Sequence, residues 1–255
     1  MNPLSAGIDG PAIGALIGSG KVADVHAYGT AVIKLLKPGR PRADAFIEAA
    51  MLAMVEAHGL PAPRVHAVGE IEGRWGLVMD RVEGTPLARL ALSDPTRVAE
   101  CLREMVRLQC MLHATTETRL RGLKTRLAAN IARAGGLSDG DRQRLGDRLA
   151  ELPDGNRLCH GDLHPFNIIG EPGQGIVIDW MDTTSGPPEA DACRSYLLLR
   201  AGAPDLAEPY LAAYCGAAGI DPAGVIAWLP VTAAARLCED VPEEQEALLA
   251  LARNF

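Results

Sequence analysis

The N-terminal part of the chain alternates apolar and polar residues with the short period of β-strands. Two runs rich in Val, Ile and Ala, at 25–28 and 31–36, flank a Gly-Thr turn at 29–30. Such runs predict two antiparallel strands, because β-branched residues pack well on a pleated surface. The runs at 65–68 and 75–79 have the same character. We therefore expect an antiparallel sheet in this part of the chain.

One helix is predicted within this sheet region, at residues 42–58. The segment is rich in alanine, and Gly59 and Pro61 follow it as helix-terminating residues. Four apolar positions repeat at helical spacing and define the expected apolar face of this helix, namely Phe46, Ala50, Met54 and Ala57.

Helical periodicity dominates from Pro95 onward. A glycine-rich turn at 135–140 separates two of the expected helices, with Ser138 or Asp139 as the N-cap. An earlier helix carries one apolar stripe made of Val98, Leu102, Met105, Leu108 and Leu112.

Two segments in the second half combine short apolar strands with polar groups at their ends. Asp162 and Asn167 stand five residues apart, and Asp179 lies twelve residues beyond Asn167. A carboxylate can orient and deprotonate a hydroxyl group, while an amide oxygen and a second carboxylate can hold Mg²⁺ against nucleotide phosphates. The alternative is that Asp162 and Asn167 only cap turns, as these residue types often do.

The sequences HGDLHPFN at 160–167 and VIDW at 177–180 resemble the catalytic loop and the metal-binding segment of the aminoglycoside phosphotransferase family. The resemblance implies the α+β fold class and a bilobal protein-kinase-like fold, with a small antiparallel-sheet N-lobe and a larger, mainly helical C-lobe. It also implies that Asp162 is the catalytic base and that Asn167 and Asp179 bind Mg²⁺.

The same resemblance covers the N-terminal strands. Gly18, Ser19 and Gly20 correspond to a glycine-rich loop over the nucleotide phosphates, although an ordinary hairpin turn is the alternative. The run AVIK places Lys34 where the family has its phosphate-binding lysine. A lysine in an apolar strand needs an anionic partner unless it reaches solvent.

Two glutamates of the helix at 42–58, Glu48 and Glu56, are candidate partners of Lys34. The family has its glutamate early in this helix, so the resemblance selects Glu48, whose ion pair would fix the lysine. Glu56 is expected on the solvated face.

Residues 76–87 resemble the hinge between the two lobes. By that resemblance Met79 is the gatekeeper, and the Asp80 carbonyl and the Val82 N–H bond the nucleobase of ATP or GTP. Glycine and proline at 84 and 86 mark a break in the chain. The expected division is an N-lobe at 1–79, a hinge at 80–84 and a C-lobe at 85–255.

Composition narrows the function classes. The chain has 255 residues, 48% of them hydrophobic, and a net charge of −7, which gives no basic footprint for nucleic acid. Its six cysteines contain no CxxC pair, so reduced thiols in a cytoplasm are expected. No apolar stretch approaches the ~20 residues of a membrane-spanning helix. The oligomeric state is not predicted.

The sequence leaves the acceptor molecule open. The segment 119–148 is basic, whereas the segment from Glu239 to Glu246 is acidic, so charge points in two directions. The hypotheses are antibiotic phosphorylation, a metabolic kinase for a sugar or amino alcohol, and a nucleotide-binding module without turnover. A protein kinase is disfavoured because no activation-loop segment is seen, and a hydrolase using Cys159 and His160 because adjacent strand side chains point to opposite faces.

Overall fold

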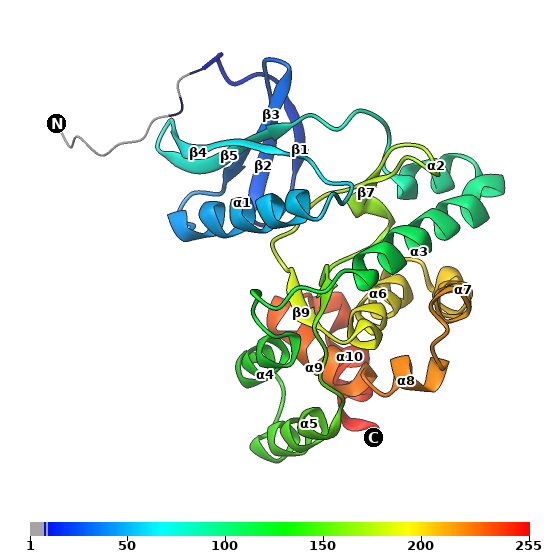
Figure 1. Ribbon diagram of the computed structural model, residues 1–255. Coiled ribbons are helices and arrows are strands. Elements are labelled where there is room, and N and C mark those ends of the chain that lie inside the picture. The colour runs from blue at the N-terminus through cyan, green and yellow to red at the C-terminus, as the bar shows by residue number, and fades with distance from the viewer. Residues whose placement is uncertain (1–7, 9) are drawn as a thin grey trace. The chain divides into compact units, whose positions relative to one another are not determined.

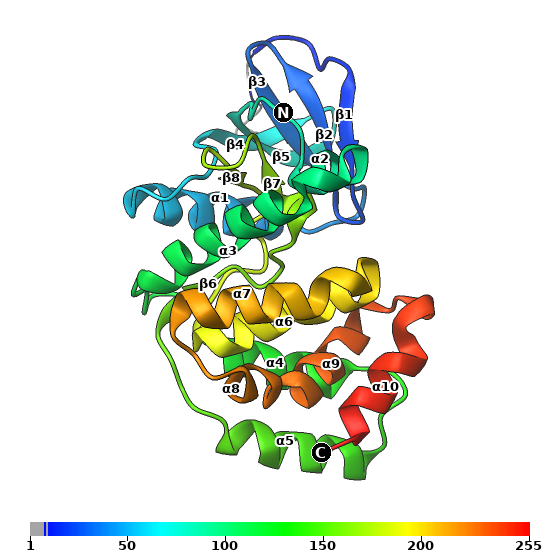
Figure 2. The ribbon, with the colours of Figure 1, turned by 90° about the vertical axis from the view of Figure 1, so that its right-hand side faces the viewer.

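The computed structural model describes Ile8 and residues 10–255; residues 1–7 and 9 of the expected N-lobe lie outside the described residues. The chain forms two compact units (Figures 1 and 2). The N-terminal unit comprises Met1–Pro86 and Ile169–Met181, and the C-terminal unit comprises Leu87–Ile168 and Asp182–Phe255. This antiparallel sheet and helical remainder confirm the α+β class.

The N-terminal unit is built on a five-stranded antiparallel sheet in the order β1-β2-β3-β5-β4. Glu72 and Gly73 close the β4–β5 hairpin, with φ values of 50° and 75°, as a tight turn that matches the twist of the strands requires. The predicted strands are confirmed, with β1 in addition. The elements are β1 (Leu16–Ser19), β2 (Ala23–Tyr28), β3 (Ala31–Leu36), α1 (Arg42–Ala57), β4 (Val65–Ile71) and β5 (Arg74–Asp80).

Strand β3 presents different residues to the two faces of this sheet. Ile33 and Leu35 pack with Tyr28 and Val78 in one cluster, while Leu36 packs with Ala45 of α1 in another. Because side chains alternate along a strand, Lys34 shares the face of Leu36, along which α1 runs in Figure 1.

The apolar face expected for α1 is wrong. Phe46 is half exposed and Ala50 and Ala57 are exposed, and the buried stripe consists of Ala45, Glu48, Leu52 and Val55. Periodicity missed this stripe because one of its members is a glutamate. That glutamate is buried because it forms an ion pair with Lys34 on the sheet.

The segment Ile169–Met181 differs from the expected division, which placed it in the C-lobe. Its chain pairs with the end of the N-terminal unit, through a bridge between Pro86 and Ile169 and a bond from the Gly170 N–H to the Thr85 carbonyl. At Gly84, φ is +120° and an added Cβ would lie 3.0 Å from the Gly170 Cα, so the two backbones approach too closely for a side chain. The hairpin is made of β7 (Ile168–Ile169) and β8 (Ile176–Val177).

The C-terminal unit is mainly helical, and helix α6 runs beside α7 in its interior (Figure 2). The predicted stripe of α3 is buried from Leu102 to Leu112, and Ser138 caps α5. The elements are α2 (Leu87–Ser93), α3 (Val98–Ala114), α4 (Leu123–Arg133), α5 (Asp139–Glu151), β6 (Arg157–Cys159), β9 (Thr184–Gly186), α6 (Pro188–Gly202), α7 (Ala207–Ala218), α8 (Pro222–Ile226), α9 (Leu229–Arg236) and α10 (Gln245–Arg253).

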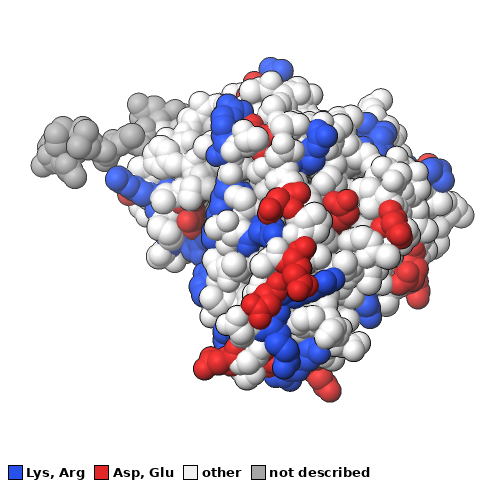
Figure 3. Space-filling view, turned by 60° about the horizontal axis from the view of Figure 1, so that its bottom comes forward, with Lys and Arg blue, Asp and Glu red and all other residues white. Residues whose placement is uncertain are grey.

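The surface carries charges of both signs. On the face drawn in Figure 3, acidic and basic side chains lie among one another, and neither sign covers the face. Within residues 10–255, no single helix has the length and apolar composition to cross a membrane. Only the pair Pro204–Ala218 and Pro222–Glu239, bent by 119°, meets both requirements together.

Candidate active site

In the N-terminal unit, three predicted site residues meet at Lys34. Its ammonium group lies 2.6 Å from Glu48 Oε1 and 2.9 Å from Asp179 Oδ1. Lys34 lies on β3, Glu48 on α1 and Asp179 in the segment after β8. Asp179 is 145 residues away from Lys34 along the chain. Glu56 instead faces Arg64 at the exposed end of α1.

Burial makes this cluster electrostatically strong. The side chains of Lys34 and Glu48 are only 11% and 2% exposed. Burial lowers the pKa of Lys34, but the negative charges of Glu48 and Asp179 outweigh it and hold the pKa above its ordinary value. The lysine is therefore a fixed cation. Glu48 Oε2 is buried and has no hydrogen-bond partner among the described residues.

Asp179 has a backbone conformation that favours a functional role. Its φ is +64°, in the left-handed region that non-glycine residues seldom occupy and that is often found at functional sites. Its carboxylate binds Lys34 through Oδ1, while the side chain as a whole stays 47% exposed. The remaining carboxylate surface is open to a ligand.

The predicted phosphate loop is a turn between β1 and β2. The Gly20 N–H donates to the Ala23 carbonyl, and Ser19 Oγ donates to Asp24. An added Cβ at Gly18 would meet no atom within 4 Å, so crowding within the protein does not explain glycine there. Lys37 also donates to Ser19, and the serine hydroxyl therefore belongs to an internal network.

The predicted hinge residues lie at the end of β5 and just beyond it. Met79 is buried and pairs with Val32 in the sheet. The Asp80 carboxylate binds His66 and the Arg64 N–H, so its side chain is engaged. The Val82 N–H has no backbone partner among the described residues. That N–H is free to donate a hydrogen bond to a ligand.

In the C-terminal unit, the segment after β6 carries two further predicted site residues, Asp162 and Asn167. Asn167 Nδ2 donates to the Asp162 carbonyl at 3.0 Å, which fixes the amide and leaves Oδ1 for a cation. Pro165–Asn167 is a single 3₁₀ turn, as expected where proline excludes a regular helix. At Gly161, φ is +83° and an added Cβ would lie 2.3 Å from the Asp182 carbonyl oxygen.

Asp162 is held as a carboxylate. Burial raises its pKa, but His164, Arg194 and His160 outweigh that effect, and the pKa lies well below its ordinary value. Arg194 Nη2 donates to Oδ1 at 2.9 Å, and His164 Nε2 lies 3.6 Å from Oδ2. The side chain is 27% exposed. An ionised and reachable carboxylate suits a base that acts on a hydroxyl group.

A buried polar cluster supports this segment from behind. Asp191 accepts the N–H groups of His160 and Gly161. His113 joins Asp191 at 3.0 Å and Tyr214 at 2.7 Å. Cys159, His113 and Asp191 also lie close enough to hold a metal. However, burial raises the pKa of the Cys159 thiol well above its ordinary value, so the thiol stays neutral and ligates poorly.

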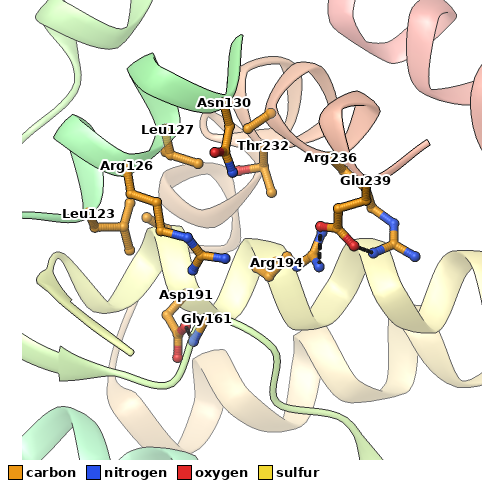
Figure 4. A pocket seen from close by; sticks show the side chains of 12 residues that line it. Leu123, Arg126, Leu127, Asn130, Gly161, Asp191, Arg194, Thr232, Arg236 and Glu239 are labelled. Atoms are coloured by element: carbon orange, nitrogen blue, oxygen red, sulfur yellow. Dashed lines mark hydrogen bonds and ion pairs between the residues drawn. The ribbon is translucent and has the colours of Figure 1, made fainter. Parts of the chain in front are cut away.

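A pocket adjoins this segment and lies wholly within the C-terminal unit (Figure 4). Gly161 and Arg194 line it near Asp162, and Glu239 lines it next to Arg194. Arg126 also lines it and binds both the carbonyl and the carboxylate of Asp182. Sequence analysis missed Arg126 and Arg194. An arginine within the apolar run of α6 was the available signal for the second, because a buried cation requires partners.

Comparison with family models gives one match. The model described as "Phosphotransferase enzyme family" (APH) matches residues 21–228 of the chain. A comparison with curated proteins gives no match.

Solved structures of low sequence identity share the fold. A thermostable mutant of aminoglycoside phosphotransferase APH(4)-Ia is 16% identical, with a TM-score of 0.67 and coverage of 94% of this chain and 92% of that one. Choline kinase LicA from Streptococcus pneumoniae is 16% identical, with a TM-score of 0.66 and coverage of 95% and 94%. APH(3'')-Id from Streptomyces rimosus ATCC10970, in complex with ADP and streptomycin, is 20% identical, with a TM-score of 0.61 and coverage of 82% and 90%. These similarities confirm the kinase-like fold.

Proposed function

Because the chain belongs to the phosphotransferase enzyme family, we propose that it transfers the γ-phosphoryl group of ATP or GTP to a hydroxyl group of a small molecule. In this proposal Lys34 contacts the α- and β-phosphates, with Gly18, Ser19 and Gly20 above them. Met79, Asp80 and Val82 border the nucleobase. Asp162 is the catalytic base.

The observation that carries the proposal is the cluster at Lys34. A lysine, an early helical glutamate and an aspartate from a distant segment meet within 2.9 Å. A nucleotide site needs a cation fixed in place, because phosphoryl transfer depends on positioning and charge neutralisation. The family match shows the class of enzyme, and this geometry supports the nucleotide contacts.

Mg²⁺ fits the donors that this chain offers. Asn167 has an amide oxygen without a partner among the described residues, and Asp179 has a half-exposed carboxylate. Hard oxygen donors of this kind are the ligands that Mg²⁺ prefers. We assign these two residues as its protein ligands, and the bound ion would neutralise phosphate charge.

Asp162 supplies the proton acceptor. Its carboxylate is ionised at neutral pH, and the neighbouring cations that lower its pKa keep it so. It can accept the proton of an acceptor hydroxyl as the oxygen–phosphorus bond forms. The carboxylate also aligns that hydroxyl for attack, which contributes to the rate independently of proton transfer.

The fold does not distinguish between acceptor classes. An aminoglycoside phosphotransferase and a choline kinase resemble this chain with TM-scores of 0.67 and 0.66. The pocket contains arginines, but Arg194 and Arg236 are paired with Glu239 and Arg126 with Asp182, so charge favours no class of acceptor. Complexes of other proteins of this fold with ADP and AMP-PNP make adenine nucleotides the first donors to test.

The test is transfer of labelled phosphate from γ-labelled ATP and GTP, with and without Mg²⁺, to a panel of acceptors. The panel holds aminoglycosides, macrolides, sugars and amino alcohols. Asp162→Asn is the inactive variant. Asp154→Asn is the matched control, because Asp154 is an exposed aspartate of the same unit, with a side chain 90% exposed.

A labelled product that requires Mg²⁺, persists in Asp154→Asn and disappears in Asp162→Asn would establish the function and identify the acceptor. Nucleotide binding without any transfer would favour a binding module instead. Failure to bind either nucleotide in the presence of Mg²⁺ would overturn the roles given to Lys34 and Asp179.

A further inference from the structure

One face of helix α6 holds four consecutive residues of the segment that carries Asp162. Asp191 accepts the N–H groups of His160 and Gly161, at 3.3 and 2.7 Å. Ser195 donates its hydroxyl to the Leu163 carbonyl at 2.8 Å. These contacts come from residues one turn apart, which lie on the same side of a helix.

Arg194 is the third residue of this face and makes a different kind of contact. Asp191 and Ser195 bind backbone groups, whereas Arg194 binds the Asp162 carboxylate, through Nη2 at 2.9 Å from Oδ1. The same nitrogen lies 2.7 Å from Glu239 Oε1. One guanidinium nitrogen therefore joins the predicted base to an acid on the wall of the pocket (Figure 4).

The position of Arg194 is strongly fixed. Its side chain is 11% exposed, and a cation buried to this extent needs anionic partners. Its Nε is buried and has no hydrogen-bond partner among the described residues, so the two carboxylates provide the contacts seen for this guanidinium. Glu239 is held in turn by Arg236 at 2.8 Å, which anchors the far side of the bridge.

We propose that Arg194 is a positioning residue for Asp162. By occupying Oδ1, the guanidinium orients the carboxylate so that Oδ2 accepts the hydroxyl proton. The bridge to Glu239 fixes the direction of the guanidinium and, through it, the direction in which Oδ2 points. This inference rests on the proposed function, because it needs Asp162 to act as the base.

The proposal makes arginine and lysine unequal at this position. A guanidinium is planar and presents its N–H groups in a fixed fork, whereas an ammonium on a flexible stem acts as a point charge. Arg194→Lys keeps the charge but loses the fixed direction, and Arg194→Met loses both. A misplacement of about 1 Å can lower a catalysed rate ~10²-fold, so orientation alone can produce a measurable effect.

The experiment compares Arg194→Met, Arg194→Lys and Glu239→Gln with the wild type, using the acceptor that the labelled-transfer panel identifies. Arg103→Gln is the matched control, because Arg103 is an exposed arginine of α3 in the same unit. We expect kcat to fall ~10- to 100-fold in Arg194→Met, with Arg194→Lys in between, Glu239→Gln showing a smaller loss, and Arg103→Gln unchanged. KM for the nucleotide should stay within about twofold, since Asp162 takes part in the chemical step.

Chemical rescue separates positioning from a general structural role. Low concentrations of guanidinium should restore part of kcat in Arg194→Ala and leave Asp162→Asn inactive, with sodium chloride as the salt control. An unchanged kcat in the folded Arg194 variants would overturn the inference while the proposed function stands. So would a loss that guanidinium does not reverse and that Arg194→Lys shares in full. Absence of transfer by the wild type would instead remove the proposed function itself.

Discussion

The two units arrange their charged groups in opposite ways. In the N-terminal unit one cation, Lys34, lies between two carboxylates and is 11% exposed. In the C-terminal unit one carboxylate, Asp162, lies beside Arg194 and His164 and is 27% exposed. A phosphate ligand needs a fixed cation, whereas a base must be reached by the hydroxyl that it deprotonates. The cation of the first cluster is therefore buried, with only Asp179 open to solvent, whereas the carboxylate of the second is itself partly exposed.

Because of this difference, substitutions in the two clusters should affect different properties of the protein, namely its stability and its activity. A buried ion pair that loses one partner leaves an uncompensated charge, which is strongly destabilising. A partly exposed carboxylate can be replaced at little structural cost, because water and its neighbours still solvate the site. We therefore expect changes at Lys34 to affect folding most and changes at Asp162 to affect turnover most.

The largest effect is expected for Asp162→Asn. If Asp162 is the base, as proposed above, its loss should lower the rate of transfer ~10²–10⁴-fold, because asparagine cannot accept the hydroxyl proton. The free energy of unfolding should change by less than about 1 kcal/mol. Rate and denaturant unfolding are measured on the same preparation, with Asp154→Asn as the control. A destabilisation as large as the one predicted for Lys34 would remove the contrast between the two clusters.

Lys34→Met should destabilise the N-terminal unit by about 3–5 kcal/mol, because Glu48 is left buried and unpaired. The double variant Lys34→Met/Glu48→Leu should regain most of this loss, since it removes the stranded charge. Fluorescence of Trp75 and Trp180, both in the N-terminal unit, follows denaturant unfolding there, and Trp228 follows the C-terminal unit. Equal instability of the single and double variants would argue against a buried-charge penalty.

The Lys34 cluster and Asp191, which binds the backbone next to Asp162, should also respond to opposite changes of pH. The pKa of Lys34 lies above its ordinary value of 10.5, so the stability that the cluster adds is present below that pH and is lost as the pH rises further. Burial raises the pKa of Asp191, but His113, His160 and the Gly161 N–H lower it below 3.8. Its contribution is therefore present above that pH and is lost as the pH falls.

Denaturant unfolding at a series of pH values tests this opposition. Lys34→Met should flatten the loss of stability above about pH 10, and Asp191→Asn should flatten the loss below about pH 4. If either variant flattened the opposite limb, the assigned cause of that limb would be wrong.

Local patterns account for much of what the sequence predicted correctly. The alternation of apolar and polar residues correctly predicted the strands around Lys34. The helical spacing of apolar residues correctly predicted the buried stripe of α3 from Leu102 to Leu112. The resemblance to the family paired Lys34 with Glu48, which the structure places 2.6 Å apart. The roles of these site residues stay predictions, since the geometry brings them together without showing a reaction.

The errors arise where distant contacts override local pattern. The apolar face of α1 was misplaced because Glu48, a polar residue, lies on the buried face. It does so because it pairs with Lys34, 14 residues earlier in the chain. The segment Ile169–Met181 fell within the expected C-lobe because one boundary was placed at residues 80–84, but its backbone pairs with Thr85 and Pro86. Arg194 was overlooked because its partners, Asp162 and Glu239, lie far away on both sides of it in the chain.

The smallest effect is expected at a helix cap outside both clusters. Ser138 accepts the Asp141 N–H, and the Asp141 carboxylate accepts the Ser138 N–H in return. Ser138→Ala should lower the stability of the C-terminal unit by about 1 kcal/mol, measured by the unfolding signal of Trp228, and should leave the transfer rate unchanged. Ser138→Asn is the control, since asparagine is an equally good cap.

An unchanged rate in Ser138→Ala would show that a modest loss of stability in this unit does not impair turnover. Rate losses in variants of Asp162 and Arg194 would then reflect chemistry and orientation. A parallel fall in rate and stability would instead mean that any weakening of the unit disturbs the base.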